Sequence, residues 1–147
     1  MVEVHINMEK EIRLKGKGEQ FKKELLNLLG QDGQLIMESV TPRGFTHRGA
    51  NSYRVHNRGN AVEITNDRGY LVFVNEGTGI YGRGSPIVPV RAKFLHFWLH
   101  GAKFAGHEIF AKSVKGQKPQ HFVERGVNDI IRTIEKDTII ASKRVLG

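Results

Sequence analysis

The chain contains no cysteine, which excludes disulfide bonds, thiolate metal sites and cysteine catalysis. Its uninterrupted apolar runs are only a few residues long, far short of the roughly 20 residues that a membrane-spanning helix needs. Residues 1–6 alternate apolar and polar side chains and lack the apolar stretch of a signal peptide. We therefore expect a protein that is made and used without passing through an oxidising compartment.

Two long stretches of the sequence also lack acidic residues. No Asp or Glu occurs between Glu38 and Glu63, or between Glu76 and Glu108, and the net charge of the chain is +8. A basic surface attracts polyanions, so these stretches are candidates for contact with DNA or with an acidic protein partner. A solvated basic surface without a partner is an equally good interpretation. The candidate basic residues are Arg43, Arg48, Arg54, Arg58, Arg83 and Arg91.

The length of 147 residues, with 39% hydrophobic and 26% charged residues, predicts one globular domain over residues 1–147. Residues 2–8 alternate in the manner of a half-buried strand. Residues 19–41 place apolar side chains at three- and four-residue steps, which predicts an amphipathic helix. Gly30 and Gly33 are expected to bend this helix or to divide it in two. Pro42 is expected to end it.

The rest of the chain predicts two hairpins and a closing helix. Residues 52–56 and 61–65 indicate the first hairpin, and residues 94–99 and 104–114 indicate the second. Residues 70–74 fit either a buried strand or a helical turn. The Gly/Pro-rich stretch 77–90 predicts a long surface loop that binds something or is mobile. A helix follows, with Pro119 in its first turn and an apolar face that extends towards residue 145.

This order of elements predicts an α+β fold, in which an N-terminal amphipathic helix and a long C-terminal helix pack on an antiparallel sheet. The sequence contains no recognisable catalytic or metal-binding signature, so no cofactor is expected. His96, His100 and His107 are the candidate metal ligands. On one straight strand, His96 and His100 would lie about 13 Å apart, too far for both to ligate one zinc ion. The loop 77–84 lacks the spacing of a phosphate-binding loop.

Sequence-nonspecific nucleic-acid binding is the alternative function. Arginines near Phe45, Tyr53 and the aromatic residues at 94, 97 and 98 would combine phosphate contacts with stacking on bases. Those three aromatic residues are more often part of a core, and no nucleic-acid-binding fingerprint is present.

A series of short motifs resembles the minor tail and tail-completion proteins of long-tailed DNA phages. Members of that family have a tyrosine-led apolar run that ends in Glu-x-Gly-Thr or Glu-Gly-Thr. A proline-containing loop, a Leu-x-Phe strand and a Lys-Gly-x-x-Pro-x-x-Phe segment then precede the last helix. The resemblance covers residues 19–137. The residues that carry it here are Tyr70, Glu76, Gly77, Thr78, Gly79, Pro86, Pro89, Leu95, Phe97, Lys115, Gly116, Pro119 and Phe122.

The resemblance implies a structural protein of the virion and not an enzyme. Such proteins form rings, here expected to be hexamers, that complete the tail or join it to the head around the DNA channel. Their implied partners are tail-tube, connector or stopper proteins, with assembly in the host cytoplasm. Glu76 is expected to stabilise a turn by accepting hydrogen bonds or pairing with an arginine. The loop 77–90 has no evident partner within the chain, so we expect a neighbouring subunit to fix it.

Overall fold

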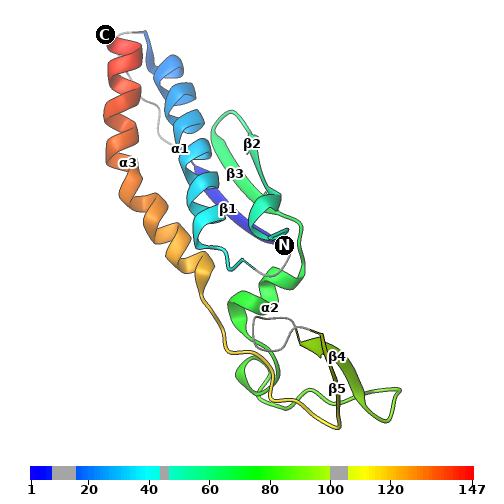
Figure 1. Cartoon of the computed structure of the whole chain (residues 1–147). Helices are drawn as coiled ribbons and strands as arrows, with labels where there is room; N and C mark the ends of the chain where they lie inside the picture. Colours follow the sequence, from blue (N-terminus) through cyan, green and yellow to red (C-terminus); the bar gives the residue numbers. More distant parts are fainter. Residues whose placement is uncertain (8–15, 44–46, 100–105) are drawn as a thin grey trace.

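The computed structural model describes residues 1–7, 16–43, 47–99 and 106–147. It shows a body, made of two long helices against a three-stranded sheet, and an extension beyond one end of these helices (Figure 1). We call this extension, residues 77–120, the arm. The elements, in chain order, are β1 (Val2–Asn7), α1 (Gly18–Val40), β2 (Tyr53–Asn57), β3 (Ala61–Asn66), α2 (Tyr70–Glu76), β4 (Leu95–Leu99), β5 (His107–Ala111) and α3 (Phe122–Leu146), with short 3₁₀ helices at Ala50–Ser52 and Gly79–Tyr81.

The sheet of the body has the strand order β1-β3-β2, with every pair antiparallel. Val4 and Val55 both lie opposite Ile64 of the central strand. The alternation of β1 buries Val2 and Val4 and leaves Glu3 exposed, because successive side chains of a strand point to opposite faces. The predicted first strand and first hairpin are confirmed, except that residue 8 lies outside the described residues.

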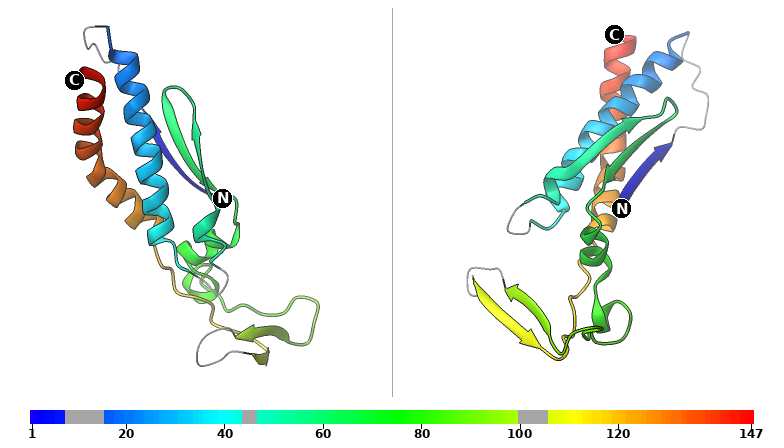
Figure 2. Two further views of the ribbon diagram at one scale, coloured as in Figure 1. Left: turned by 45° about the horizontal axis from the view of Figure 1, so that its top comes forward. Right: turned by 90° about the vertical axis from the view of Figure 1, so that its right-hand side faces the viewer.

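Helices α1 and α3 cover the apolar face of this sheet, as two views show (Figures 1 and 2). Leu26, Met37, Ile64 and Phe122 are completely buried between these layers. The antiparallel sheet with a long C-terminal helix packed on it confirms the predicted α+β fold. Burial of such side chains contributes about 1.5–3 kcal/mol each.

The glycines of α1 do not divide the helix, which runs uninterrupted from Gly18 to Val40. A Cβ atom built on Gly33 would lie 2.4 Å from Cδ1 of Ile64, and one built on Gly30 would lie 2.8 Å from Cγ1 of Val55. The two glycines therefore let the helix backbone approach the sheet closely, and the expected division was wrong. The helix ends just before Pro42, as predicted.

The two alternatives for residues 70–74 are resolved in favour of a helix, α2. The start predicted for the last helix was wrong, because α3 begins at Phe122 and Pro119 lies three residues before it. Residue His121 takes a left-handed conformation, with φ of 48°, and so turns the chain into the helix. The segment before it, residues 115–120, makes backbone hydrogen bonds to α2 and to residues 78 and 80.

The arm carries the second hairpin, in which β4 and β5 pair antiparallel. Figures 1 and 2 place it away from the sheet and from the two long helices. Phe94 and Trp98 are 45% and 50% exposed, so the expectation that they belong to a core was wrong. Residues 100–105, which include His100 and part of the predicted second strand, lie outside the described residues.

Candidate functional site

Two segments that were singled out in the sequence, around Gly77–Gly79 and Lys115–Pro119, lie side by side where the arm leaves the body. The N–H of Thr78 donates to the carbonyl of Gln117 at 2.9 Å, and the N–H of Ile80 donates to the carbonyl of Lys115 at 2.8 Å. The hydroxyl oxygen of Thr78 accepts from the N–H of Gln117 at 2.9 Å. We call these paired segments, residues 77–80 and 115–119, the junction. Its bonds join the two ends of the arm to each other.

Two glycines make this close approach possible. Gly79 and Gly116 have φ of 62° and 96°, which L residues rarely adopt. A Cβ atom on Gly79 would lie 2.1 Å from the carbonyl oxygen of Lys115, and a Cβ atom on Gly116 would lie 2.2 Å from that of Thr78. Any side chain at either position would therefore force the two backbones apart.

Next to the junction, further bonds connect the end of α2 to the start of α3. The N–H groups of Gln120 and His121 donate to the carbonyls of Val74 and Asn75 at 3.0 and 3.2 Å. The buried side chain of Asn75 accepts from the N–H of Val123 at 3.0 Å, which satisfies a donor that the first turn of α3 leaves free. These bonds hold the end of α2 against the beginning of α3, next to the two ends of the arm.

Sequence reasoning missed Asn75. Asparagine is a common capping residue, but it usually caps the helix that it begins, whereas Asn75 is 48 residues from the N–H that it accepts. Next to this cap, the pKa of Glu124 is lowered, first by a hydrogen bond from its own backbone and then by Asn75 and His121.

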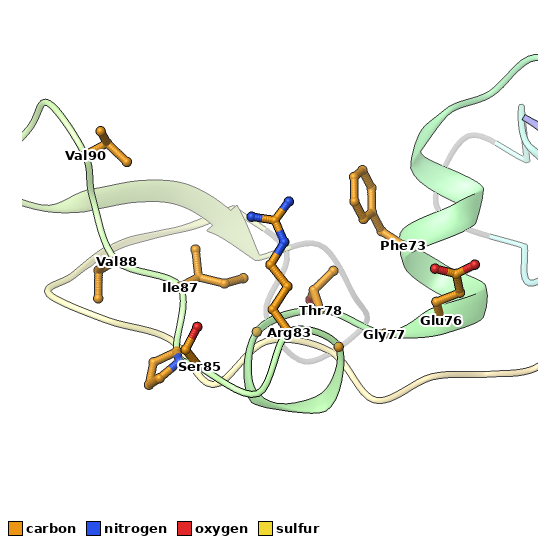
Figure 3. Close-up of a pocket in the computed structure, with 12 residues that line it drawn as sticks. Phe73, Glu76, Gly77, Thr78, Arg83, Ser85, Ile87, Val88 and Val90 are labelled. Carbon is orange, nitrogen blue, oxygen red and sulfur yellow. The ribbon is translucent and has the colours of Figure 1, made fainter.

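An open groove of about 790 Å³ lies beside the junction, between α2 and the segment 82–90. Figure 3 shows the side chain of Arg83 extending between the segment that carries Ile87 and the ring of Phe73. Gly77, Thr78 and Gly79 of the junction form part of its lining. Its lining also includes Glu76, Ser85, Val88 and Val90.

The groove has few ionisable groups in its lining. Its described lining contains one carboxylate, one guanidinium and no histidine that would act as a base. Glu76 is exposed at the end of α2. Within the described ranges Glu76 makes neither a turn hydrogen bond nor an arginine pair, and the role expected of it stays a prediction.

The loop 77–90 does have partners within the chain, contrary to expectation. Besides the junction bonds, Ile87 and Val114 form an isolated antiparallel bridge, with mutual N–H to carbonyl distances of 2.9 and 3.0 Å. Residues Gly79–Tyr81 form a 3₁₀ helix. These bonds satisfy backbone groups that a free loop would leave to water.

The six candidate arginines do not form one surface. Arg54 and Arg58 belong to the β2–β3 hairpin, and the Nε of Arg58 lies 3.0 Å from a carboxylate oxygen of Glu63. Arg83 and Arg91 lie on the arm. Arg43 and Arg48 lie between α1 and the first 3₁₀ helix. The basic stretches of the sequence therefore reach different parts of the molecule.

Of the histidines considered as metal ligands, His96 makes other contacts, and His100 lies outside the described residues. The ring of His96 stacks on Phe110, with centroids 4.7 Å apart, and its Nε2 lies 2.6 Å from a carboxylate oxygen of Glu108. In the part of the chain that the structure describes, no three His, Asp or Glu residues are grouped to hold a metal ion. None of the helices described there has the length and apolar character for crossing a membrane.

Comparison of the chain with protein-family models, curated proteins and solved structures gave no match.

Proposed function

We propose that this protein is a structural component of a phage virion and not an enzyme. It would be one subunit of a ring that completes the tail, or joins it to the head, around the DNA channel. The junction is the observation that supports this proposal. The short motifs that resemble tail-completion proteins meet there through backbone hydrogen bonds, and they anchor an exposed arm.

A ring requires two different surfaces on each subunit, because each copy contacts its neighbours through heterologous interfaces. An arm that projects from a compact body supplies a surface of that kind. A sixfold ring follows from the family resemblance alone. Its proposed partners are tail-tube, connector or stopper proteins, and it would be part of the virion after assembly in the host cytoplasm.

Genetic complementation tests the proposal. In a phage that lacks this gene, we expect electron microscopy to show filled heads and separate tails, and the wild-type gene to restore joined particles. Gly77→Val should fail to restore them, because Gly77 has φ of 83° and a Cβ atom there would lie 2.9 Å from the carbonyl oxygen of Gln117.

Gly84→Val is the matched control. Gly84 has a similar φ of 80°, but no atom lies within 4 Å of its Cβ position. This variant should restore joining much better than Gly77→Val. Normal head–tail joining in the complete absence of the protein would refute the proposed role, as would a gene neighbourhood without portal, capsid or tail genes.

One observation favours the second candidate, sequence-nonspecific nucleic-acid binding. The exposed rings of Trp98 and Phe110 lie on an arm that also carries Arg91, Lys93 and Lys112, and aromatic rings beside cations are typical of single-strand binding. Trp98 is the one tryptophan of the chain, so its fluorescence reports on this surface. Quenching by oligonucleotides that weakens steeply with salt would favour this alternative.

A further inference from the structure

The β4–β5 hairpin exposes apolar side chains that the described residues of its own chain leave uncovered. Trp98 and Phe110 are 50% and 62% exposed. They share one face, because their cross-strand partners are Glu108 and His96. The other face carries Phe97 opposite Ile109 and is only partly buried. A two-stranded hairpin is marginally stable by itself, so a covering partner would stabilise it.

The charges around the hairpin define the chemistry of that partner. Arg91 and Lys93 precede β4, and Lys112 follows β5. Glu108 is the only acid of the arm sequence, and it already faces His96. A complementary surface must therefore combine apolar side chains with carboxylates.

One stripe on the solvent-facing side of α3 has this composition, while the neighbouring Arg132 and Lys136 are basic. Ile131, Glu135 and Ile139 follow one another at four-residue steps and so form one stripe along the helix. The two isoleucines are 58% and 49% exposed, which is unusual for large apolar side chains in the middle of a helix that packs on a sheet. Glu135 lies between them and is exposed. We call these three residues the α3 stripe.

The arm of a subunit does not reach its own α3 stripe. The arm joins α3 at Phe122, and the rise of 1.5 Å per residue places Ile131 and Ile139 about 14 and 26 Å further along the helix axis. All views show the arm beyond the N-terminal end of α3, while the helix runs away from it (Figures 1 and 2). The two surfaces are complementary but lie on separate parts of one molecule.

We propose that the β4–β5 hairpin of one copy docks on the α3 stripe of a second copy. Trp98 and Phe110 would cover Ile131 and Ile139, while Lys93 and Lys112 would approach Glu135. Such a contact is heterologous, and it leaves one free arm and one free stripe for the next copies. The inference rests on the proposed function for ring closure, but the contact itself needs only two copies of this chain.

Site-specific photocrosslinking of the full-length protein tests the contact. The photoreactive residue p-benzoylphenylalanine replaces Trp98, and an isotope-labelled copy without it is the target. At about 1 mM total protein we expect crosslinked dimers whose labelled peptide contains residues 131–139. The same photoreactive residue at Tyr70, which is also 50% exposed but lies on α2, should not give this product.

Charge reversal supplies the second measurement. Lys93→Glu with Lys112→Glu in the photoreactive copy should lower the crosslink yield about tenfold, and Glu135→Lys in the labelled copy should recover most of it. Arg54→Glu, on the β2 strand, is the control and should leave the yield unchanged. Recovery by the opposite charge separates a direct contact from general destabilisation.

Two results would overturn the proposal: no dimer at 1 mM, or crosslinks that map only outside α3. These results are distinct from failure of the phage role. A mapped arm–α3 crosslink in a protein that is dispensable for head–tail joining would keep the docking and refute the virion function.

Discussion

The body and the arm of this protein are held in place by different interactions. The body has a core in which large side chains such as Leu26 and Phe122 are completely buried. In the described residues of the arm, only Gly77 and Gly79 are buried, and backbone hydrogen bonds at the junction fix its two ends. The body is therefore stabilised by its own packing, whereas the arm keeps its apolar side chains available to another molecule.

The largest expected effect is on the free energy of unfolding, and it compares a phenylalanine of the body with one of the arm. Phe122→Ala should lower the free energy of unfolding by about 3–5 kcal/mol, because it removes a completely buried ring from the core. Phe110→Ala, at a side chain that is 62% exposed on the arm, should change it by no more than about 0.5 kcal/mol. Urea unfolding followed by circular dichroism measures both. Equal losses for the two variants would contradict the division into body and arm.

The second prediction concerns the junction. Gly79→Ala places a methyl group against the carbonyl of Lys115 and puts an L residue in a left-handed conformation. Together these two effects should cost about 1–3 kcal/mol or more. Amide hydrogen exchange at Thr78, Ile80 and Gln117 should accelerate about tenfold or more, since 1.4 kcal/mol corresponds to a factor of ten. Exchange in α1 should stay unchanged.

Gly84→Ala separates the two contributions, because Gly84 has a similar φ but open space around its Cβ position. It should show the conformational cost without the steric one. If both variants accelerate exchange at the junction equally, the close approach of the two backbones is not what holds the arm.

The body was more predictable from the sequence than the junction, for a physical reason. Apolar side chains recur at the helical period in α1 and α3 and alternate in β1, because one face of each element is buried. The junction relies on N–H and carbonyl groups, which every residue has, and it joins Thr78 to Gln117 across 39 positions. Only the positions of its glycines leave a signal in the sequence. The cap from Asn75 and the exposure of Trp98 depend on tertiary arrangement and left none.

The third prediction concerns a polar group inside the body. Asp137 is completely buried on α3, and neither of its carboxylate oxygens has a hydrogen-bond partner among the described residues. Burial raises the pKa of Asp137, and the nearby Asp32 carboxylate raises it further, while Lys136 opposes the shift. The folded state therefore holds this proton at pH values where the unfolded chain has lost it.

It follows that this group makes the protein less stable as pH rises from the ordinary Asp pKa near 4 through the raised pKa. Asp137→Asn does not ionise, so it should increase the free energy of unfolding at pH 7 by about 1–3 kcal/mol. The increase should shrink towards pH 4. Thermal unfolding at pH 4, 5.5 and 7 measures this, with Asp129→Asn, a more exposed acid on the same helix, as the control. A gain independent of pH would contradict a raised pKa.

The smallest expected effect lies where the body meets the arm. Asn75→Ala removes the oxygen that accepts from the N–H of Val123, and the loss of such a cap costs about 1 kcal/mol. The matched control is Asn128→Ala, at an exposed position inside α3, where alanine should be neutral or slightly stabilising. Urea unfolding gives the global change, and hydrogen exchange at Val123 gives the local one. Because the Asn75 side chain also holds α2 against the start of α3, exchange at the junction amides should accelerate too. If exchange rises at Val123 but not at the junction, the cap serves the body alone, and the arm is anchored by its own backbone bonds.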